Sequence, residues 1–72
     1  MLAMKLSARN QLAGTIVDVA AGAVTTTVKV RLAGGDVVTS SITKEAADEL
    51  GLAAGGAVTV VVKASDVILA VE

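Results

Sequence analysis

The stretch TTTVKVRL, residues 25–32, decides how the rest of this 72-residue chain is interpreted. Val28, Val30 and Leu32 fall on one face of an extended chain, and the residues between them are lysine and arginine. A period of two predicts a β-strand with one face in a core and the other in water.

Turn signals and further strands flank this segment. GTIVDVAAGAV, residues 14–24, predicts a strand through about Val19 and a turn near residues 21–22. AGGD, residues 33–36, has the glycines of a hairpin connection. VVTSSIT, residues 37–43, is rich in β-branched side chains and predicts a third strand.

The pattern changes at Thr43, where TKEAADELGL predicts a helix of about two turns. Thr43 is suited to the N-cap and Glu45 to the first turn. Gly51 stands where a left-handed residue ends a helix, and Leu52 can make the accompanying apolar contact.

Two more strands are predicted after the helix, AVTVVVKA at 57–64 and VILAV at 67–71, with a tight turn near Ser65 and Asp66. Residues 1–72 therefore form one domain, all-β with one short helix, in the order β-β-β-α-β-β. This order is close to that of the five-stranded Greek-key barrel called the OB-fold. Residues 1–4 are expected to be a flexible N-terminal extension.

The chain is expected to be oligomeric. Both faces of residues 58–62 and of residues 67–71 are apolar, whereas a small barrel buries only one face of each strand. Small domains usually need disulfides, metals or oligomerisation for stability, and the chain has no Cys and no His. Contact with a second subunit is the simplest way to bury the remaining apolar surface.

Composition argues against several functions. Without His or Cys, and with its carboxylates scattered over turns and helix faces, the chain is not expected to be an enzyme. Without aromatic residues and with a net charge of −1, it is not expected to bind nucleic acid. The longest uncharged run has thirteen residues and contains glycines, so no membrane partner is expected and a cytoplasmic location is predicted.

Binding of a small oxyanion fits the residues better, because a few hydroxyls, main-chain N–H groups and fixed positive charges suffice for it. The candidates stand in three groups: Arg9 with Ser7 and Asn10, Lys63 with Ser65, and Thr43 with Lys44. A plainer interpretation of solvated charges at strand ends and an ordinary helix cap remains open from the residues alone.

Several ordered motifs then make the chain resemble the molbindins, the single Mop-domain molybdate-binding proteins. They are SARNQL-G at 7–14, GAV at 22–24, ITKE at 42–45, LGL--G at 50–55 and VKAS-VILAV at 62–71. The resemblance implies an OB-like fold, a hexamer built as a trimer of dimers, and oxyanion sites between subunits.

The resemblance also implies ligand residues. Ser7, Ala8 and Arg9 of one subunit are expected to meet Thr43 and Lys63 of another. A second class of site near a symmetry axis is expected to involve Lys44, Ala64 and Ser65. No side chain coordinates molybdenum in this scheme, and no cofactor is expected, because the protein recognises the oxygens of the anion.

The function implied is intracellular storage or buffering of molybdate, with tungstate as a near-equivalent ligand. The alternative is an interaction or regulatory module, homologous to the sensing domain of a molybdate transporter or regulator. One departure from the family pattern concerns Ala46, which stands where many relatives carry serine. A hydroxyl that could reach the anion is therefore missing.

Overall fold

The computed structural model describes residues 6–72, and the expected extension at residues 1–4 lies outside this range. Within the described residues there are four strands, one α-helix and one 3₁₀ turn, in the order β1 (Asn10–Ala21), β2 (Thr25–Leu32), β3 (Val37–Thr43), α1 (Lys44–Leu50), β4 (Ala57–Val62) and η1 (Ala64–Asp66). The prediction of a mostly β domain with one short helix is confirmed.

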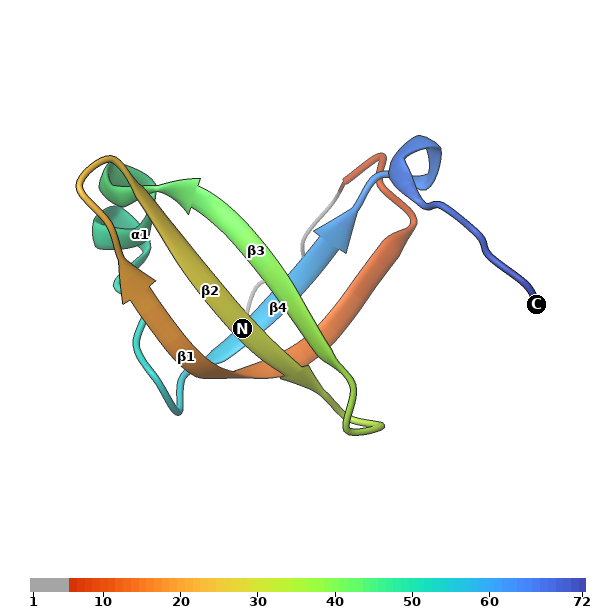
Figure 1. Ribbon diagram of the computed structural model, residues 1–72, viewed down its shortest axis with the longest axis horizontal. Helices are drawn as coiled ribbons and strands as arrows, with labels where there is room; N and C mark the ends of the chain where they lie inside the picture. The colour runs from red at the N-terminus through yellow and green to blue at the C-terminus, as the bar shows by residue number, and fades with distance from the viewer. Residues whose placement is uncertain (1–5) are drawn as a thin grey trace.

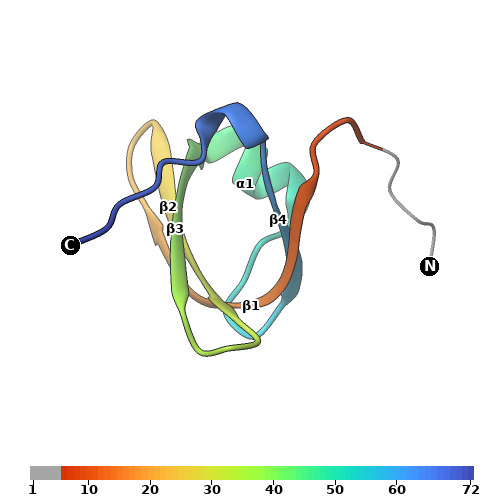
Figure 2. The ribbon, with the colours of Figure 1, turned by 90° about the vertical axis from the view of Figure 1, so that its right-hand side faces the viewer.

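The four strands form one antiparallel sheet in the order β3-β2-β1-β4. β1 is long enough to serve two partners, since residues 10–15 pair with β4 and residues 14–21 pair with β2. A register shift between Ile16 and Asp18 interrupts its pairing with β2. The sheet curls into a half-barrel, whose floor in Figure 2 is the bend of β1 and whose walls are β4 and the pair β2–β3.

The core lies inside this curl and consists of aliphatic side chains. Ile16, Val28 and Val30 are buried, and they are packed by half-buried residues of all four strands and of the loop after α1: Val19, Leu32, Ile42, Leu52, Val58 and Val60. The inward face of β2 is therefore the one that its alternating sequence predicts. An open apolar groove of about 200 Å³ remains on the inner side, lined in part by Val38, Ile42 and Val60.

Both predicted ends of the helix are confirmed. The hydroxyl oxygen of Thr43 accepts a hydrogen bond from the Ala46 N–H at 3.1 Å, as an N-cap side chain does. Gly51 has a φ of 64°, and its N–H donates to the carbonyl groups of Ala47 and Asp48. Leu52 turns back into the core, so the helix covers one end of the half-barrel (Figure 1).

The fifth strand predicted at residues 67–71 does not form within this chain. The segment runs away from the sheet in Figure 1 and has no strand partner. Its side chains are exposed, at 91% for Ile68, 87% for Leu69 and 97% for Val71. Although β3 and β4 are open edges of the sheet, the chain turns at η1 and continues away from the sheet, so the segment reaches neither edge (Figure 1). The barrel is therefore open, and this apolar C-terminal arm, residues 67–72, is uncovered.

We expect Gly14→Ala to destabilise the fold by about 1–3 kcal/mol, as overpacking usually does. A Cβ atom at Gly14 would lie 2.5 Å from Val30 Cγ1 and 2.9 Å from the Arg31 carbonyl oxygen, so β1 and β2 must separate. Urea unfolding at constant protein concentration measures the change. Gly34→Ala is the matched control, since a Cβ there meets nothing within 4 Å. Equal midpoints for the two variants would contradict the close approach of β1 and β2.

None of the helices in residues 6–72 is long and apolar enough to cross a membrane.

Candidate oxyanion site

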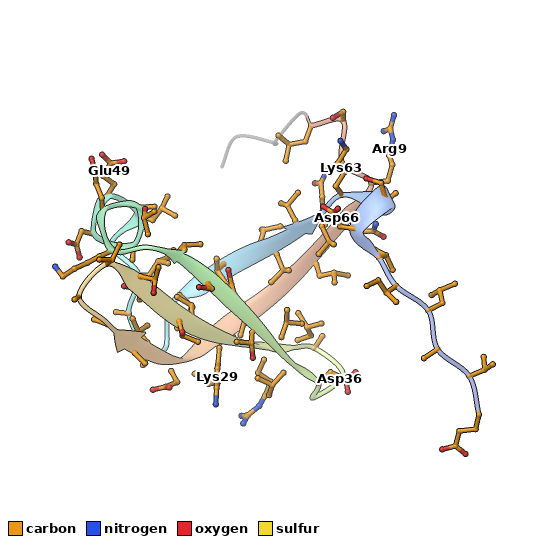
Figure 3. The ribbon with its side chains drawn as sticks, turned by 45° about the horizontal axis from the view of Figure 1, so that its top comes forward. Arg9, Lys29, Asp36, Glu49, Lys63 and Asp66 are labelled. Carbon is orange, nitrogen blue, oxygen red and sulfur yellow. The ribbon has the colours of Figure 1, made fainter. Side chains whose placement is uncertain are left out.

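Two positive charges lie side by side at the end of the β1–β4 ladder. The register pairs Asn10 with Val62 and Gln11 with Val61, so its continuation by one residue sets Arg9 opposite Lys63. Figure 3 shows both side chains at this end of the molecule. Side chains at opposed positions of antiparallel strands are about 5 Å apart at Cβ, so one further step of the ladder would bring the two cations within reach of one small ligand.

Neither cation forms an ion pair with a carboxylate of residues 6–72. The only ion pair among residues 6–72 joins Lys44 Nζ to Asp48 Oδ2 at 3.2 Å, so no carboxylate of the described chain lies within 4 Å of Arg9 or Lys63. Asp66 also lies at this end (Figure 3), one turn of η1 after Lys63. Two uncompensated like charges repel each other, and an anion between them relieves that repulsion. The Arg9–Lys63 pair is therefore suited to a small anion.

Most of the predicted ligand residues are brought to this same end by chain connectivity. They are the residues just before β1 and at its start, and the residues just after β4: Ser7, Ala8, Arg9, Asn10, Lys63, Ala64 and Ser65. We call this group the cationic end. It combines two cations, two serine hydroxyls and main-chain N–H groups outside the regular ladder, which are the donors that oxyanion binding needs.

Thr43 and Lys44 lie elsewhere. They stand where β3 passes into α1, at the far side of the molecule from the cationic end (Figure 1). The Lys44 ammonium is engaged with Asp48. The Thr43 oxygen already accepts the Ala46 N–H, so its own hydroxyl hydrogen is free to donate to a ligand.

The division of donors between subunits stays a prediction, in which Thr43 and Lys63 of one subunit meet Ser7, Ala8 and Arg9 of another. Within one chain, Lys63 lies at the same end as Arg9, because β1 and β4 are neighbours in the sheet. Thr43 lies at the far side, so it can meet Arg9 only from a second copy.

Gln11 is absent from the predicted set of site residues. Its side-chain Nε2 donates to the Ala8 carbonyl oxygen at 3.0 Å, which ties the segment before β1 to the strand itself. Its position in the polar run SARNQ was the one feature of the sequence that could have indicated a role at the site, but amide side chains in such runs are usually solvated.

Residues 6–72 contain no group of three or more His, Cys, Asp or Glu side chains that could hold a metal ion. A curled antiparallel sheet with a helix between its third and fourth strands, and a cationic end, defines a small OB-like domain with an anion-attracting surface. Residues 6–69 match the TOBE domain, and the chain belongs to this family.

Known proteins of similar sequence and structure bind molybdenum compounds. The molybdenum-pterin-binding protein 3 of Clostridium pasteurianum is 46% identical over 66 residues, which are 92% of this chain and 97% of that protein. The structure of MopII from the same organism, without ligand, has a TM-score of 0.88 and 42% identity, covering 93% of this chain and 100% of MopII.

The structure of ModG, described as a cytoplasmic molybdate-binding protein and determined with molybdate bound, has a TM-score of 0.87 and 49% identity. The similarity covers 90% of this chain and 46% of ModG. These relatives confirm the resemblance to the molbindins that the sequence motifs indicate.

Proposed function

We propose that the protein binds molybdate reversibly, with tungstate as a near-equivalent ligand, and that it stores or buffers the anion in the cytoplasm without catalysing a reaction. The observation that carries the proposal is the Arg9–Lys63 pair, two adjacent cations with no carboxylate of the described chain within 4 Å. Relatives that bind molybdenum compounds support the choice of anion.

The chemistry of recognition is hydrogen bonding to the anion's oxygens. Arg9 offers a planar fork of N–H donors, and Lys63 a compact charge that follows the ligand. Ser7 donates a hydroxyl hydrogen bond and Ala8 a main-chain N–H. Desolvating a dianion is costly unless nearly every oxygen finds a donor, so donors are also needed on the side of the anion that faces away from the cationic end.

A second copy of the chain completes the site in this proposal. Among the predicted ligand residues, Thr43 is the hydroxyl donor that lies outside the cationic end, and it stands at the far side of its own chain. The uncovered C-terminal arm and the open apolar groove each need a partner surface, which supports assembly. We propose a hexamer, a trimer of dimers, in which the Thr43 end of one subunit meets the cationic end of another. Lys44, Ala64 and Ser65 then belong to a second class of site near a symmetry axis.

Calorimetric titration of the purified protein with sodium molybdate, sodium tungstate and sodium sulfate tests the proposal. We expect binding of molybdate and tungstate at micromolar concentrations and much weaker binding of sulfate, because the three anions share charge and shape and the smaller sulfate would reach fewer donors of a site sized for molybdate. Absence of molybdate binding under these conditions would exclude storage and favour the alternative of a module that acts by contacting a partner protein.

Ala46→Ser is expected to raise the affinity for molybdate about tenfold. Ala46 lies in the first turn of α1, next to the Thr43 cap, and a hydroxyl there adds one donor at the ligand. A hydrogen bond to a charged group contributes about 1.5–3 kcal/mol, from which the lower helix propensity of serine subtracts about 0.5 kcal/mol. Titration calorimetry measures the gain. Ala53→Ser, in the exposed loop after α1, is the matched control, and equal affinities for both variants would remove Ala46 from the site.

A further inference from the structure

The hydrogen bond from Gln11 to Ala8 fixes one peptide group at the cationic end. Gln11 belongs to β1 and faces Val61 of β4, so its backbone is held in the sheet. Its Nε2 donates to the Ala8 carbonyl oxygen at 3.0 Å. This contact attaches to β1 the segment of residues 7–9, which precedes the first strand and is outside the paired part of the ladder.

The held carbonyl determines where the neighbouring N–H points. The Ala8–Arg9 peptide is trans, since the described chain contains no cis peptide bond, and the C=O and N–H of a trans peptide point in opposite directions. With the Ala8 carbonyl directed to Gln11, the Arg9 N–H is directed away from it. No backbone oxygen in residues 6–72 accepts that N–H.

The Arg9 N–H also stands at an open edge of the sheet. Residues 10–13 of β1 pair only with β4, and pairing with β2 begins at Gly14. The Ile16 N–H donates to the Gly56 carbonyl at 2.9 Å, and bonded and unbonded pairs alternate along an antiparallel ladder. Counting back along the same register, Arg9 occupies an unbonded position, so its N–H is directed away from β4 toward the free edge.

We propose that Gln11 is a positioning residue of the oxyanion site: it orients the Ala8–Arg9 peptide so that the Arg9 main-chain N–H faces the free edge of β1, on the side away from Lys63, where it donates to an anion that the Arg9 guanidinium group and the long Lys63 side chain also reach. This inference rests on the proposed binding of molybdate. A donor fixed before binding loses little conformational freedom when the ligand arrives, so Gln11 contributes to affinity without touching the anion.

Gln11→Met tests this role, because methionine has a similar length and no donor. We expect the affinity for molybdate to fall about tenfold, which corresponds to one lost hydrogen bond to a charged ligand. The dependence of affinity on salt concentration should stay as in the wild type, since no charge changes. The mass of the assembly and the thermal midpoint without ligand should also be unchanged, because Gln11 is exposed.

A nuclear magnetic resonance signature separates positioning from a general structural effect. In the wild type, saturation with molybdate should shift the Arg9 amide proton strongly downfield, and in Gln11→Met this shift should be much smaller. Thr15→Val, an apolar substitution at another exposed position of β1, is the matched control and should keep the full shift.

The outcomes are distinguishable. If the wild type binds molybdate and Gln11→Met keeps both its affinity and its Arg9 amide shift, Gln11 has no positioning role, while the proposed function stands. If the wild type does not bind molybdate at all, the proposed function fails and this inference fails with it.

Discussion

Arg9→Ala is expected to lower the affinity for molybdate about a hundredfold or more while the assembly keeps its mass. Arg9 lies opposite Lys63 with no carboxylate of the described chain within 4 Å, so its charge is available to the ligand. The substitution removes that charge and up to two charge-assisted hydrogen bonds, each contributing about 1.5–3 kcal/mol. Titration calorimetry gives the affinity, and light scattering gives the mass.

Two further variants sharpen this result. Arg9→Lys keeps a point charge but loses the planar fork of donors, and should give an intermediate affinity. Arg31→Ala removes an exposed arginine of β2, away from the cationic end, and should bind as the wild type does. An unchanged affinity in Arg9→Ala would mean that the anion binds elsewhere.

The double substitution Ile68→Asp with Leu69→Asp is expected to reduce the assembly to the 7.1 kDa chain and to abolish molybdate binding at micromolar concentrations. These two residues lie on opposite faces of the C-terminal arm and are about nine-tenths exposed. Covering them with a second copy stabilises the assembly by roughly 1.5–3 kcal/mol for each side chain, and a carboxylate at either position opposes that burial. Analytical ultracentrifugation measures the mass.

Ala54→Asp adds the same kind of charge in the exposed loop before β4 and serves as the control, with mass and binding expected to be unchanged. A double variant of wild-type mass would show that the arm is not what joins the subunits. A monomeric variant with undiminished binding would show that one chain holds the whole site, which contradicts the role proposed for Thr43 in a second copy.

Local features of the sequence predicted the elements well. The alternation in residues 25–32 identifies the inward face of β2, and Thr43 and Gly51 mark the ends of α1 because capping depends on neighbours within one turn. The start of β1 was less visible. SARNQ has no apolar alternation, and Asn10 and Gln11 are extended because β4, some fifty residues later, pairs with them.

Long-range geometry limited what the sequence could predict. VILAV has the composition of a strand, but whether it pairs depends on the direction in which the chain leaves η1, and here that direction is away from the sheet. The donors alone indicated three separate groups of residues, and the family resemblance joined them into a set of ligand residues, most of which lie at the cationic end. Which of them lie together within one chain depends on the order of the strands. The placement of Lys63 at the same end as Arg9 therefore became clear only from the sheet.

The distance between Thr43 and the cationic end has a consequence for a cell that contains this protein. If each site takes donors from two chains, free subunits carry only half-sites. The number of complete sites then depends on the concentration of the protein as well as on that of the anion. Dilution then releases molybdate, and added molybdate promotes assembly. A cell that synthesises more of the chain gains both additional sites and tighter retention in those it already has.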